Sequence, residues 1–250
     1  MNNETTEIKW SYEPPDYLEV SYKAAHAGAL IELTAGCATA ILDVAHDQIP
    51  SDLLASIEAV VKTILQTHML ETGRTCHISK PKVIQHQADG KKTTAISVGA
   101  SVMIASGQPV DLLTTTPDGT VVKDTRAERI ASREALVKLF AEAVEKEPLV
   151  GRLLASYQSA IDDSQNAFVH LYEIRDALVW HYGDAEAVRT QLDLSKKDWG
   201  LLGELANARP VQESRHRGKY MGRLRQATHD ELTEARKIAR TIVEAFARSI

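Results

Sequence analysis

The spacing of apolar residues changes once along this chain of 250 residues, near Thr125. Before that point, short runs alternate apolar and polar residues, which is the period of a strand. Beyond it, apolar residues recur every three or four positions, which is the period of a helix. This order predicts an α+β fold, with a small mixed strand and helix part followed by a helical bundle. The expected division is a flexible segment over residues 1–17, a mixed α+β domain over 18–124 and an α-helical bundle over 125–250.

Three extended runs and one helix are expected in the first part. Alternation predicts strands over residues 29–33 and 38–44, and a run rich in Thr, Ser, Val and Ile predicts another over 92–105. Residues 51–73 repeat apolar side chains at three- and four-residue steps and predict an amphipathic helix. Two Asp-Gly dipeptides between extended runs predict hairpin turns: Asp89-Gly90 and Asp118-Gly119.

The second part shows helical periodicity throughout, with recognisable helix starts. Helices are predicted over residues 126–146, from Pro148 through Tyr157, from about 163 to 182, and over 231–249. Two pairs have the spacing of N-terminal caps: Ser195 with Asp198, and Thr228 with Glu231. Helices of this kind need one another's apolar faces, so a bundle is expected.

Composition limits the classes of function. The chain is 44% hydrophobic and 25% charged, with a formal net charge of -5, so it is not expected to wrap nucleic acid over its whole surface. Cys37 and Cys76 lack CxxC spacing and nearby histidine pairs, so neither a metal site nor a disulfide scaffold is expected. The N-terminus is polar and no apolar segment approaches about 20 residues, which favours a cytoplasmic protein without a membrane segment.

One segment is strongly basic, although the chain as a whole has a negative net charge. The basic loop, residues 209–225, holds six Lys or Arg residues and His216 against a single acid, Glu213. It is longer than a usual connection between bundle helices, and Gly218 and Gly222 relax its backbone. Because guanidinium groups bind phosphate as a planar fork, a local site for a phosphodiester is predicted here. The candidate phosphate-binding residues are Arg217, Lys219, Arg223 and Arg225.

An ordinary structural role fits the same loop equally well. Arginines and lysines in loops are usually solvated, and this cluster could also bind the acidic first part of the same chain, in pairs that stabilise little when they are exposed. Ion pairing within the chain would bury the arginines, whereas an anion site would leave them lining a cleft. The two interpretations therefore differ in what a structure shows.

A second candidate set lies on the helix expected over residues 163–182. At 3.6 residues per turn, Asn166, His170 and Glu173 share one face, at the margin of the apolar stripe. His170 and Glu173 are therefore candidates for substrate binding. The alternative is an ordinary contact between residues three positions apart.

The C-terminal helices resemble the HEPN superfamily, over roughly residues 149–250. Its members are small helical bundles, and many are metal-independent ribonucleases of bacterial defence and toxin systems. Their motif is an arginine and a histidine with four to six residues between them, near the start of a late helix. Arg209 and His216, with six residues between them, meet that spacing. The chain departs from the family at Pro210, where active members commonly carry Asn, Asp or His.

The resemblance implies a catalytic role for this loop. His216 would move protons while Arg209 or Arg215 stabilised the phosphate, as the ribose 2′-hydroxyl of RNA attacked its neighbouring phosphate. Neither a metal nor a cofactor would be needed. Such enzymes usually build the cleft across a two-fold axis, so a homodimer is expected from the resemblance.

Two non-catalytic functions remain open at this stage. One is a nucleotide-binding or RNA-binding module, and the other is a protein-interaction module. The chain lacks the glycine-rich phosphate loops GxxxxGK and GxGxxG, the GxSxG elbow and the HExxH zinc motif. The sequence thus singles out one loop and leaves its chemistry open.

Overall fold

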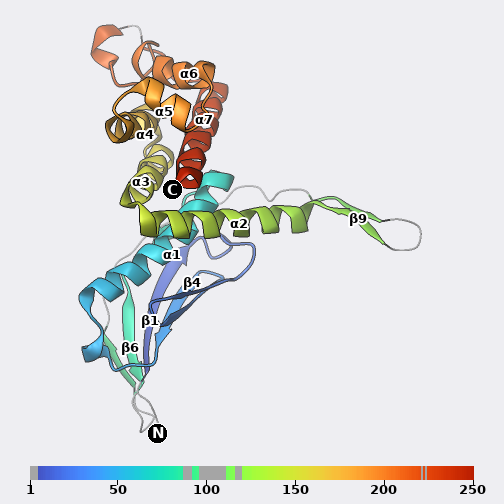
Figure 1. The fold of residues 1–250 in the computed structure, drawn as a ribbon, viewed down its shortest axis with the longest axis vertical. Helices are drawn as coiled ribbons and strands as arrows, with labels where there is room; N and C mark the ends of the chain where they lie inside the picture. Colours follow the sequence, from blue (N-terminus) through green and yellow to red (C-terminus); the bar gives the residue numbers. More distant parts are fainter. Residues whose placement is uncertain (1–4, 87–91, 96–110, 116–119, 221, 223) are drawn as a thin grey trace. The chain divides into compact units, whose positions relative to one another are not determined.

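The computed structural model describes residues 5–86, 92–95, 111–115, 120–220, 222 and 224–250. It has an antiparallel sheet in its N-terminal part and helices in its C-terminal part, which confirms the predicted α+β class (Figure 1). Contacts divide the chain into two units, each described here by itself. The first unit comprises residues 1–68 and 76–136, and the second comprises 69–75 and 137–250. The division falls inside two helices, α1 (Ser51–Thr72) and α2 (Thr125–Lys146).

The first unit is built on a seven-stranded antiparallel sheet with the order β2-β3-β4-β1-β6-β7, in which β5 also pairs with β1. Its strands are β1 (Thr5–Glu13), β2 (Tyr22–His26), β3 (Ala29–Thr34), β4 (Cys37–Leu42), β5 (His77–Ile78), β6 (Lys82–His86) and β7 (Lys92–Ala95). The strands expected over 29–33 and 38–44 are β3 and β4. Of the strand expected over 92–105, β7 is the described portion, and the Asp89-Gly90 turn lies outside the described residues.

The N-terminal segment is a correction to the sequence prediction. Residues 5–13 were expected to be flexible, yet they form β1, which pairs with β4 on one side and with β6 on the other. Every second side chain of this strand is buried: Thr6, Ile8, Trp10 and Tyr12. The intervening positions are Glu7, Lys9 and Ser11, so the strand alternates as a half-buried strand should, although its composition is polar.

The helix α1 (Ser51–Thr72) supplies the other side of this core. Ile57, Val61 and Ile64 are fully buried, and Tyr17 donates a hydrogen bond of 3.0 Å to the carbonyl oxygen of Leu65. By length and composition alone α1 is apolar enough to cross a membrane, contrary to the expectation from the sequence. Half of its most apolar stretch is buried inside the chain, as in the core helix of a folded domain.

A separate hairpin lies between the sheet and α2 (Thr125–Lys146). It consists of β8 (Leu113–Thr115) and β9 (Val121–Asp124), which pair with each other and with no strand of the larger sheet. The base of the hairpin is closed by Thr125, whose backbone N–H donates to the carbonyl oxygen of Leu112 at 3.0 Å. Arg129 of α2 pairs with Asp111 at 2.7 Å and with Glu19, and so joins the hairpin to the rest of the first unit. The expected Asp118-Gly119 turn lies outside the described residues.

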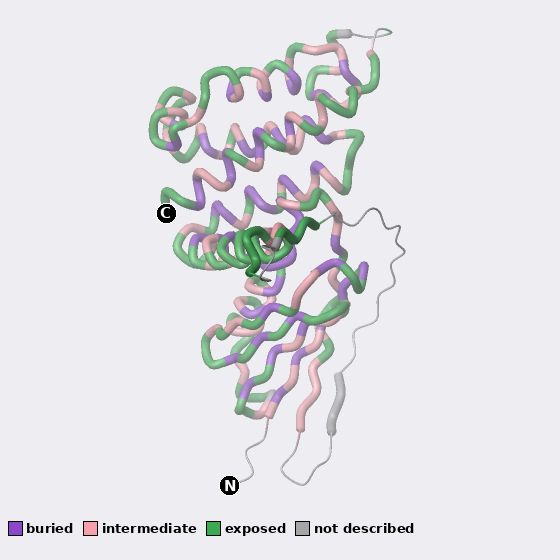
Figure 2. Tube along the Cα trace, turned by 90° about the vertical axis from the view of Figure 1, so that its right-hand side faces the viewer, coloured by how far each residue is buried: buried purple, intermediate pink, exposed green. Residues whose placement is uncertain are grey.

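The second unit is a bundle in which α4 contacts four other helices: α3, α5, α6 and α7. The helices are α3 (Pro148–Asp162), α4 (Ala167–Tyr182), α5 (Ala185–Gln191), α6 (Lys196–Asn207) and α7 (His229–Ser249). Short 3-10 turns occur at η1 (His46–Gln48), η2 (Ser164–Asn166) and η3 (Arg217–Tyr220), the first of them in the other unit. Apolar stripes from α3, α4, α6 and α7 form the core, and exposed residues alternate with them along each helix (Figure 2).

Both predicted N-terminal caps are confirmed, whereas the helices expected from about 163 and from 231 begin at Ala167 and His229. Ser195 accepts a hydrogen bond from the backbone N–H of Asp198, and Thr228 forms a full capping box with Glu231. The short helix α5 was not predicted, because seven residues are too few for a periodic pattern. Its cap is visible in the sequence nonetheless, since Asp184 accepts from the backbone N–H groups of Glu186 and Ala187 at 2.8 Å each.

Candidate functional site

The basic loop connects α6 to α7 and has a defined backbone. Val211 and Arg225 form a parallel β-bridge, so the two ends of the loop run side by side. The backbone N–H of Arg215 donates to the carbonyl oxygen of Ala206 at 2.9 Å, which holds the loop against the end of α6. Val211 and Ser214 are buried beneath it. The described ends of the loop are therefore held by backbone hydrogen bonds against α6 and against each other.

At the root of the loop, two arginines share one carboxylate. Arg209 Nη1 donates to Glu231 Oε1 at 2.6 Å, and its Nε donates to Glu204 Oε1 at 3.1 Å. Arg225 binds both oxygens of Glu231 at 2.7 Å each. Glu231 also accepts from the backbone N–H of Thr228 at 2.9 Å, as the capping box requires. This cluster, the Glu231 clamp, ties both ends of the loop to the first turn of α7.

The clamp perturbs the pKa values of its members in the stabilising direction. The Arg225 guanidinium, the Thr228 N–H and the Arg209 guanidinium hold the pKa of Glu231 far below its usual range, although burial opposes them. Hydrogen bonds to Glu231 raise the pKa of Arg225, and bonds to Glu231 and Glu204 raise that of Arg209. Both arginines are thus ion-paired within the chain, but their partners lie in the second unit and the side chains stay 34% and 46% exposed, unlike the burial against the first part that the ion-pair interpretation expected.

Arg215 extends away from the Glu231 clamp and contacts the surface of α4. Its Nη1 donates to Asp176 Oδ2 at 3.1 Å, and its Cζ lies 4.4 Å from the centre of the Tyr172 ring. Arg175 lies near the same ring at 5.0 Å and over Trp199 at 4.3 Å. The guanidinium groups and rings therefore form a ladder of cation–π contacts between the loop, α4 and α6.

Arg175 is accommodated by a glycine. A Cβ atom at Gly203 of α6 would overlap Nη1 of Arg175, so only glycine leaves room for this guanidinium. Burial lowers the pKa of Arg175, and its buried Nε has no hydrogen-bond partner within the described part of the chain. The aromatic faces of Tyr172 and Trp199 take the place of hydrogen-bond acceptors here.

Arg217 differs from Arg209, Arg215 and Arg225 in bonding to neutral oxygens instead of carboxylates among the described residues. Its Nε donates to the carbonyl oxygen of Ser214 at 3.0 Å, and its Nη2 donates to the carbonyl oxygen of Gln165 at 3.3 Å and to Asn166 Oδ1. An arginine carries five N–H groups, so the two on Nη1 have no hydrogen-bond partner among the described residues. Three bonds fix the guanidinium in place while one edge stays available to a ligand.

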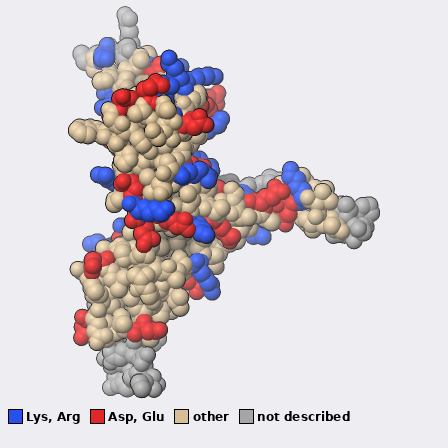
Figure 3. All heavy atoms as spheres, in the orientation of Figure 1, with Lys and Arg blue, Asp and Glu red and all other residues tan. Residues whose placement is uncertain are grey.

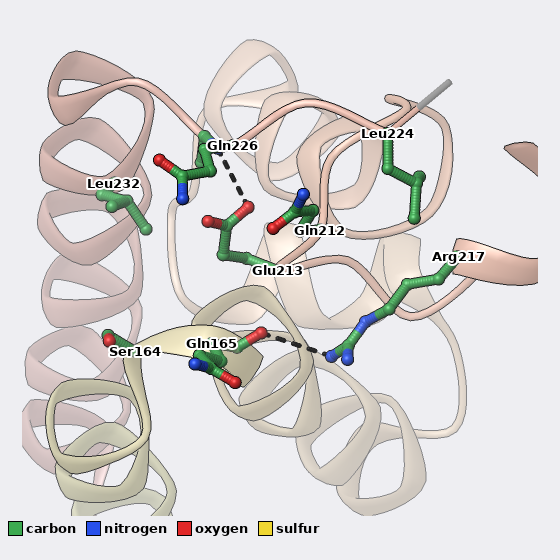
Figure 4. A pocket seen from close by; sticks show the side chains of 9 residues that line it. Ser164, Gln165, Gln212, Glu213, Arg217, Leu224, Gln226 and Leu232 are labelled. Atoms are coloured by element: carbon green, nitrogen blue, oxygen red, sulfur yellow. Dashed lines mark hydrogen bonds between the residues drawn. The ribbon is translucent and has the colours of Figure 1, made fainter. Parts of the chain in front are cut away.

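The same arginine lines a cleft of about 610 Å³. Polar side chains predominate on its walls, with three apolar ones beside them: Ser164, Gln165, Gln212, Glu213, Arg217, Gln226, Leu224, Ala227 and Leu232. In Figure 4, Arg217 reaches from η3 towards Gln165, and Gln212 and Glu213 lie between the two sides of the cleft. Glu213 Oε2 accepts a hydrogen bond from the backbone N–H of Ala227 at 2.9 Å, and this bond joins two residues that line the cleft.

The remaining loop residues are placed as follows. His216 is exposed, and its side chain makes no hydrogen bond or ion pair with any described residue. Lys219 is also exposed, on η3, and its backbone N–H donates to the carbonyl oxygen of His216 at 3.0 Å. Arg223 lies outside the described residues. No contact among the described residues joins His216 to Arg209, because the clamp directs Arg209 towards α7.

His170 and Glu173 belong to a polar network that reaches Arg217 through Asn166. The ring nitrogens of His170 lie 3.4 Å from Asp163 Oδ2 and 3.5 Å from Glu173 Oε2. Asn166 donates from Nδ2 to Asp163 Oδ2 at 2.7 Å, while its Oδ1 accepts from Arg217. The bond from Asn166, followed by that from His170, lowers the pKa of Asp163. Hence Asn166, not His170, is the residue of this face that contacts the basic loop.

The sequence pattern predicted the basic loop but not the residues that its side chains contact. Arg217 is the predicted residue that lines the cleft, whereas Arg209, Arg215 and Arg225 are paired with carboxylates. The three glutamines of the cleft and Tyr172 were not predicted, and no local pattern marks them. In Figure 3, acidic and basic side chains are interspersed over the helices of the second unit, which is consistent with this pairing.

No protein-family model, curated protein or solved structure matches this chain. The resemblance to the HEPN superfamily therefore stays a prediction. Among the described residues, no three His, Cys, Asp or Glu side chains gather as a metal site.

Proposed function

We propose that the second unit binds a nucleotide, either free or within RNA, in the cleft beside Arg217. The observation that carries the proposal is the guanidinium of Arg217, which is held by three hydrogen bonds and keeps both N–H groups of Nη1 available at the wall of the cleft. A cation fixed in advance loses little conformational freedom when it binds phosphate.

The remaining walls suit the other parts of a nucleotide. The amides of Gln165, Gln212 and Gln226 each offer a donor and an acceptor for a base edge. Glu213 offers a carboxylate that can accept from a ribose hydroxyl, and the leucines offer apolar surface for a base face. A volume of about 610 Å³ lies within the range of small-molecule sites.

A metal-independent ribonuclease is the second candidate, because the imidazole of His216 is exposed and free of described partners beside Arg215 and Arg217. An unpaired imidazole can accept and donate protons near neutral pH. In this candidate Arg217, with its available donors, meets the phosphate in place of Arg209, and a homodimer completes the site. A cytoplasmic location accompanies either candidate, with both cysteines present as free thiols.

One experiment separates the candidates. Fluorescently labelled single-stranded RNA is titrated with the full chain in EDTA, and binding is followed by anisotropy while a gel reports cleavage. The proposal expects saturable binding that Arg217→Ala weakens at least about tenfold. Arg248→Ala, an exposed arginine of α7, serves as the matched control and should leave binding unchanged.

The outcomes assign the function. Binding without cleavage, displaced by a mononucleotide, supports the nucleotide site alone. Cleavage that is lost in His216→Ala supports the ribonuclease. Equal binding by the wild type and Arg217→Ala contradicts the proposed site.

A further inference from the structure

Arg175 of α4 is a cation that no carboxylate binds among the described residues. Its Cζ lies 4.3 Å from the centre of the Trp199 ring and 5.0 Å from that of Tyr172. Neither a hydrogen bond nor an ion pair joins its guanidinium to another described residue, and the nearby Asp176 acts on it only through charge. The rings offset part of that charge, but they leave the N–H donors without an acceptor in the described part of the chain. Arg175 therefore meets the condition for binding an anion.

Arg215 brings a second guanidinium to the same ring. Its Cζ lies 4.4 Å from the centre of Tyr172, so both guanidinium groups are within contact distance of one aromatic side chain. Within the described residues, the guanidinium of Arg215 makes one hydrogen bond, from Nη1 to Asp176 Oδ2 at 3.1 Å. Two cations thus share one carboxylate, which leaves a net positive charge beside Tyr172. Because the oxygens of a phosphate accept several hydrogen bonds at once, one phosphate can bind both groups.

The surface of α6 beside Arg175 carries little that would block a ligand. Gly203 has no side chain, and a Cβ atom there would overlap Nη1 of Arg175. One turn earlier, Gly200 is exposed, and a Cβ atom added to it would meet open space within the described part of the molecule. Arg175 is half-buried, and the side chain of Arg215 is 36% exposed. Glycine lets a ligand approach the backbone closely, so both guanidinium groups can be reached from solvent at this surface.

The arginine pair is separated from the cleft of Arg217 along α4. Arg215 and Arg217 are two residues apart in the loop, but their side chains contact different parts of this helix. Arg217 bonds to Asn166, the residue before α4. Arg215 contacts Tyr172, which lies six residues, or about 9 Å of helix, further on. The phosphates of a diphosphate share an oxygen atom and are too close together to reach both places, whereas phosphates on either side of a ribose are further apart, as in a nucleotide strand.

We propose that Arg175 and Arg215 form a second phosphate subsite, and that the ligand of the cleft is a strand of RNA instead of a free mononucleotide. The inference rests on the proposed nucleotide site, because Arg217 binds one phosphate of the strand and the arginine pair binds another. Surfaces that bind single strands combine cations along the backbone with aromatic side chains, as the arginines and Tyr172 do here. Asp176 limits the affinity of the subsite, because its carboxylate competes with phosphate for Arg215.

Titration calorimetry of the full chain tests the subsite with two probes: adenosine 5′-monophosphate, and the 5′-phosphorylated dinucleotide of adenosine, which carries a second phosphate between its riboses. The wild type is expected to bind the dinucleotide about tenfold more tightly. Arg175→Gln and Arg215→Gln should each reduce this preference to less than about threefold. Because the preference is a ratio measured on one preparation, a general loss of folded protein does not change it. Arg248→Gln, at an exposed arginine of α7, is the matched control and should keep the wild-type preference.

Asp176→Asn supplies a test that a folding defect cannot imitate. Removing the competing carboxylate should raise the preference for the dinucleotide about threefold above that of the wild type. Equal affinities of the wild type for the two probes, or a preference that survives in both Arg175→Gln and Arg215→Gln, overturn the subsite. If these results accompany monophosphate binding that Arg217→Gln weakens, the nucleotide site stands without the subsite. Dinucleotide binding that depends on Arg175 but not on Arg217 would support the subsite and contradict the proposed nucleotide site.

Discussion

The root and the middle of the basic loop use the same residue type in opposite ways. At the root, Arg209 binds the carboxylates of Glu204 and Glu231, and Arg225 binds that of Glu231. These ion pairs fix the loop to α7. In the middle, Arg217 bonds to neutral oxygens and keeps two donors facing no described partner. A cluster of arginines is therefore not one site, because the partner of each guanidinium decides whether it stabilises the fold or can bind a ligand.

Replacing Glu231, the carboxylate that Arg209 and Arg225 share, tests this comparison most strongly. Glu231→Gln removes the charge that both arginines pair with and weakens the capping box, so unfolding free energy should fall by about 2 kcal/mol. Urea denaturation measures this change. Glu234→Gln, on the same helix and paired only at 3.9 Å with Lys237, should change it by less than about 0.5 kcal/mol. Equal effects of the two substitutions would show that the clamp is not structural.

The pH dependence of stability tests the same clamp, because protonation removes the charge of Glu231 and leaves its side chain in place. The folded-state pKa of Glu231 lies below its unfolded value of about 4.3. Its contribution is thus complete above about pH 4.3 and is lost as the pH falls towards the folded-state value. Denaturation midpoints of the wild type and Glu231→Gln should therefore differ most near neutral pH and converge in acid. A difference that stays constant down to pH 2 would contradict the assigned pKa direction.

The two arginines of the clamp can be separated from each other. Arg209→Ala and Arg225→Ala should each lower the unfolding free energy by about 1 kcal/mol, measured by urea denaturation. The double variant should lose less than the sum, because both side chains act through Glu231. Strict additivity would mean that the shared carboxylate does not couple them.

The smallest expected effect concerns the residue that positions Arg217. Asn166→Ala removes one of its three hydrogen bonds, so nucleotide affinity should fall about threefold, with an unfolding free energy changed by less than about 0.5 kcal/mol. Titration calorimetry and urea denaturation of the same preparation check both. His170→Ala, which contacts the network but not Arg217, should leave affinity unchanged.

The fold could be predicted where local signals agree with the period of the apolar residues. The helix starting at Pro148 and the capping box of Thr228 are examples, since each combines a cap with a periodic stripe. Strand β1 carries the same alternation in Ile8, Trp10 and Tyr12, but the polar composition of residues 1–17 hides that short signal, and pairing with β4 and β6 makes it a strand.

The candidate site was predicted only to the level of the loop. Composition alone marked the cluster of cations, but the partners that divide the arginines come from elsewhere in the chain. Asp176 and Asn166 lie about forty to fifty residues before the arginines that they contact, and Glu231 lies in the next helix. Contacts over such separations depend on the packing of α4, α6 and α7, which no local pattern encodes.

The most direct test of the central claim compares a nucleoside 5′-monophosphate with the matching nucleoside by titration calorimetry. Both ligands are titrated into the wild type, Arg217→Gln and Arg225→Gln under conditions where all three are folded. If Arg217 alone meets the phosphate, the monophosphate should bind about tenfold more tightly than the nucleoside in the wild type and in Arg225→Gln, and equally in Arg217→Gln. A preference for the monophosphate that survives in Arg217→Gln would contradict the account.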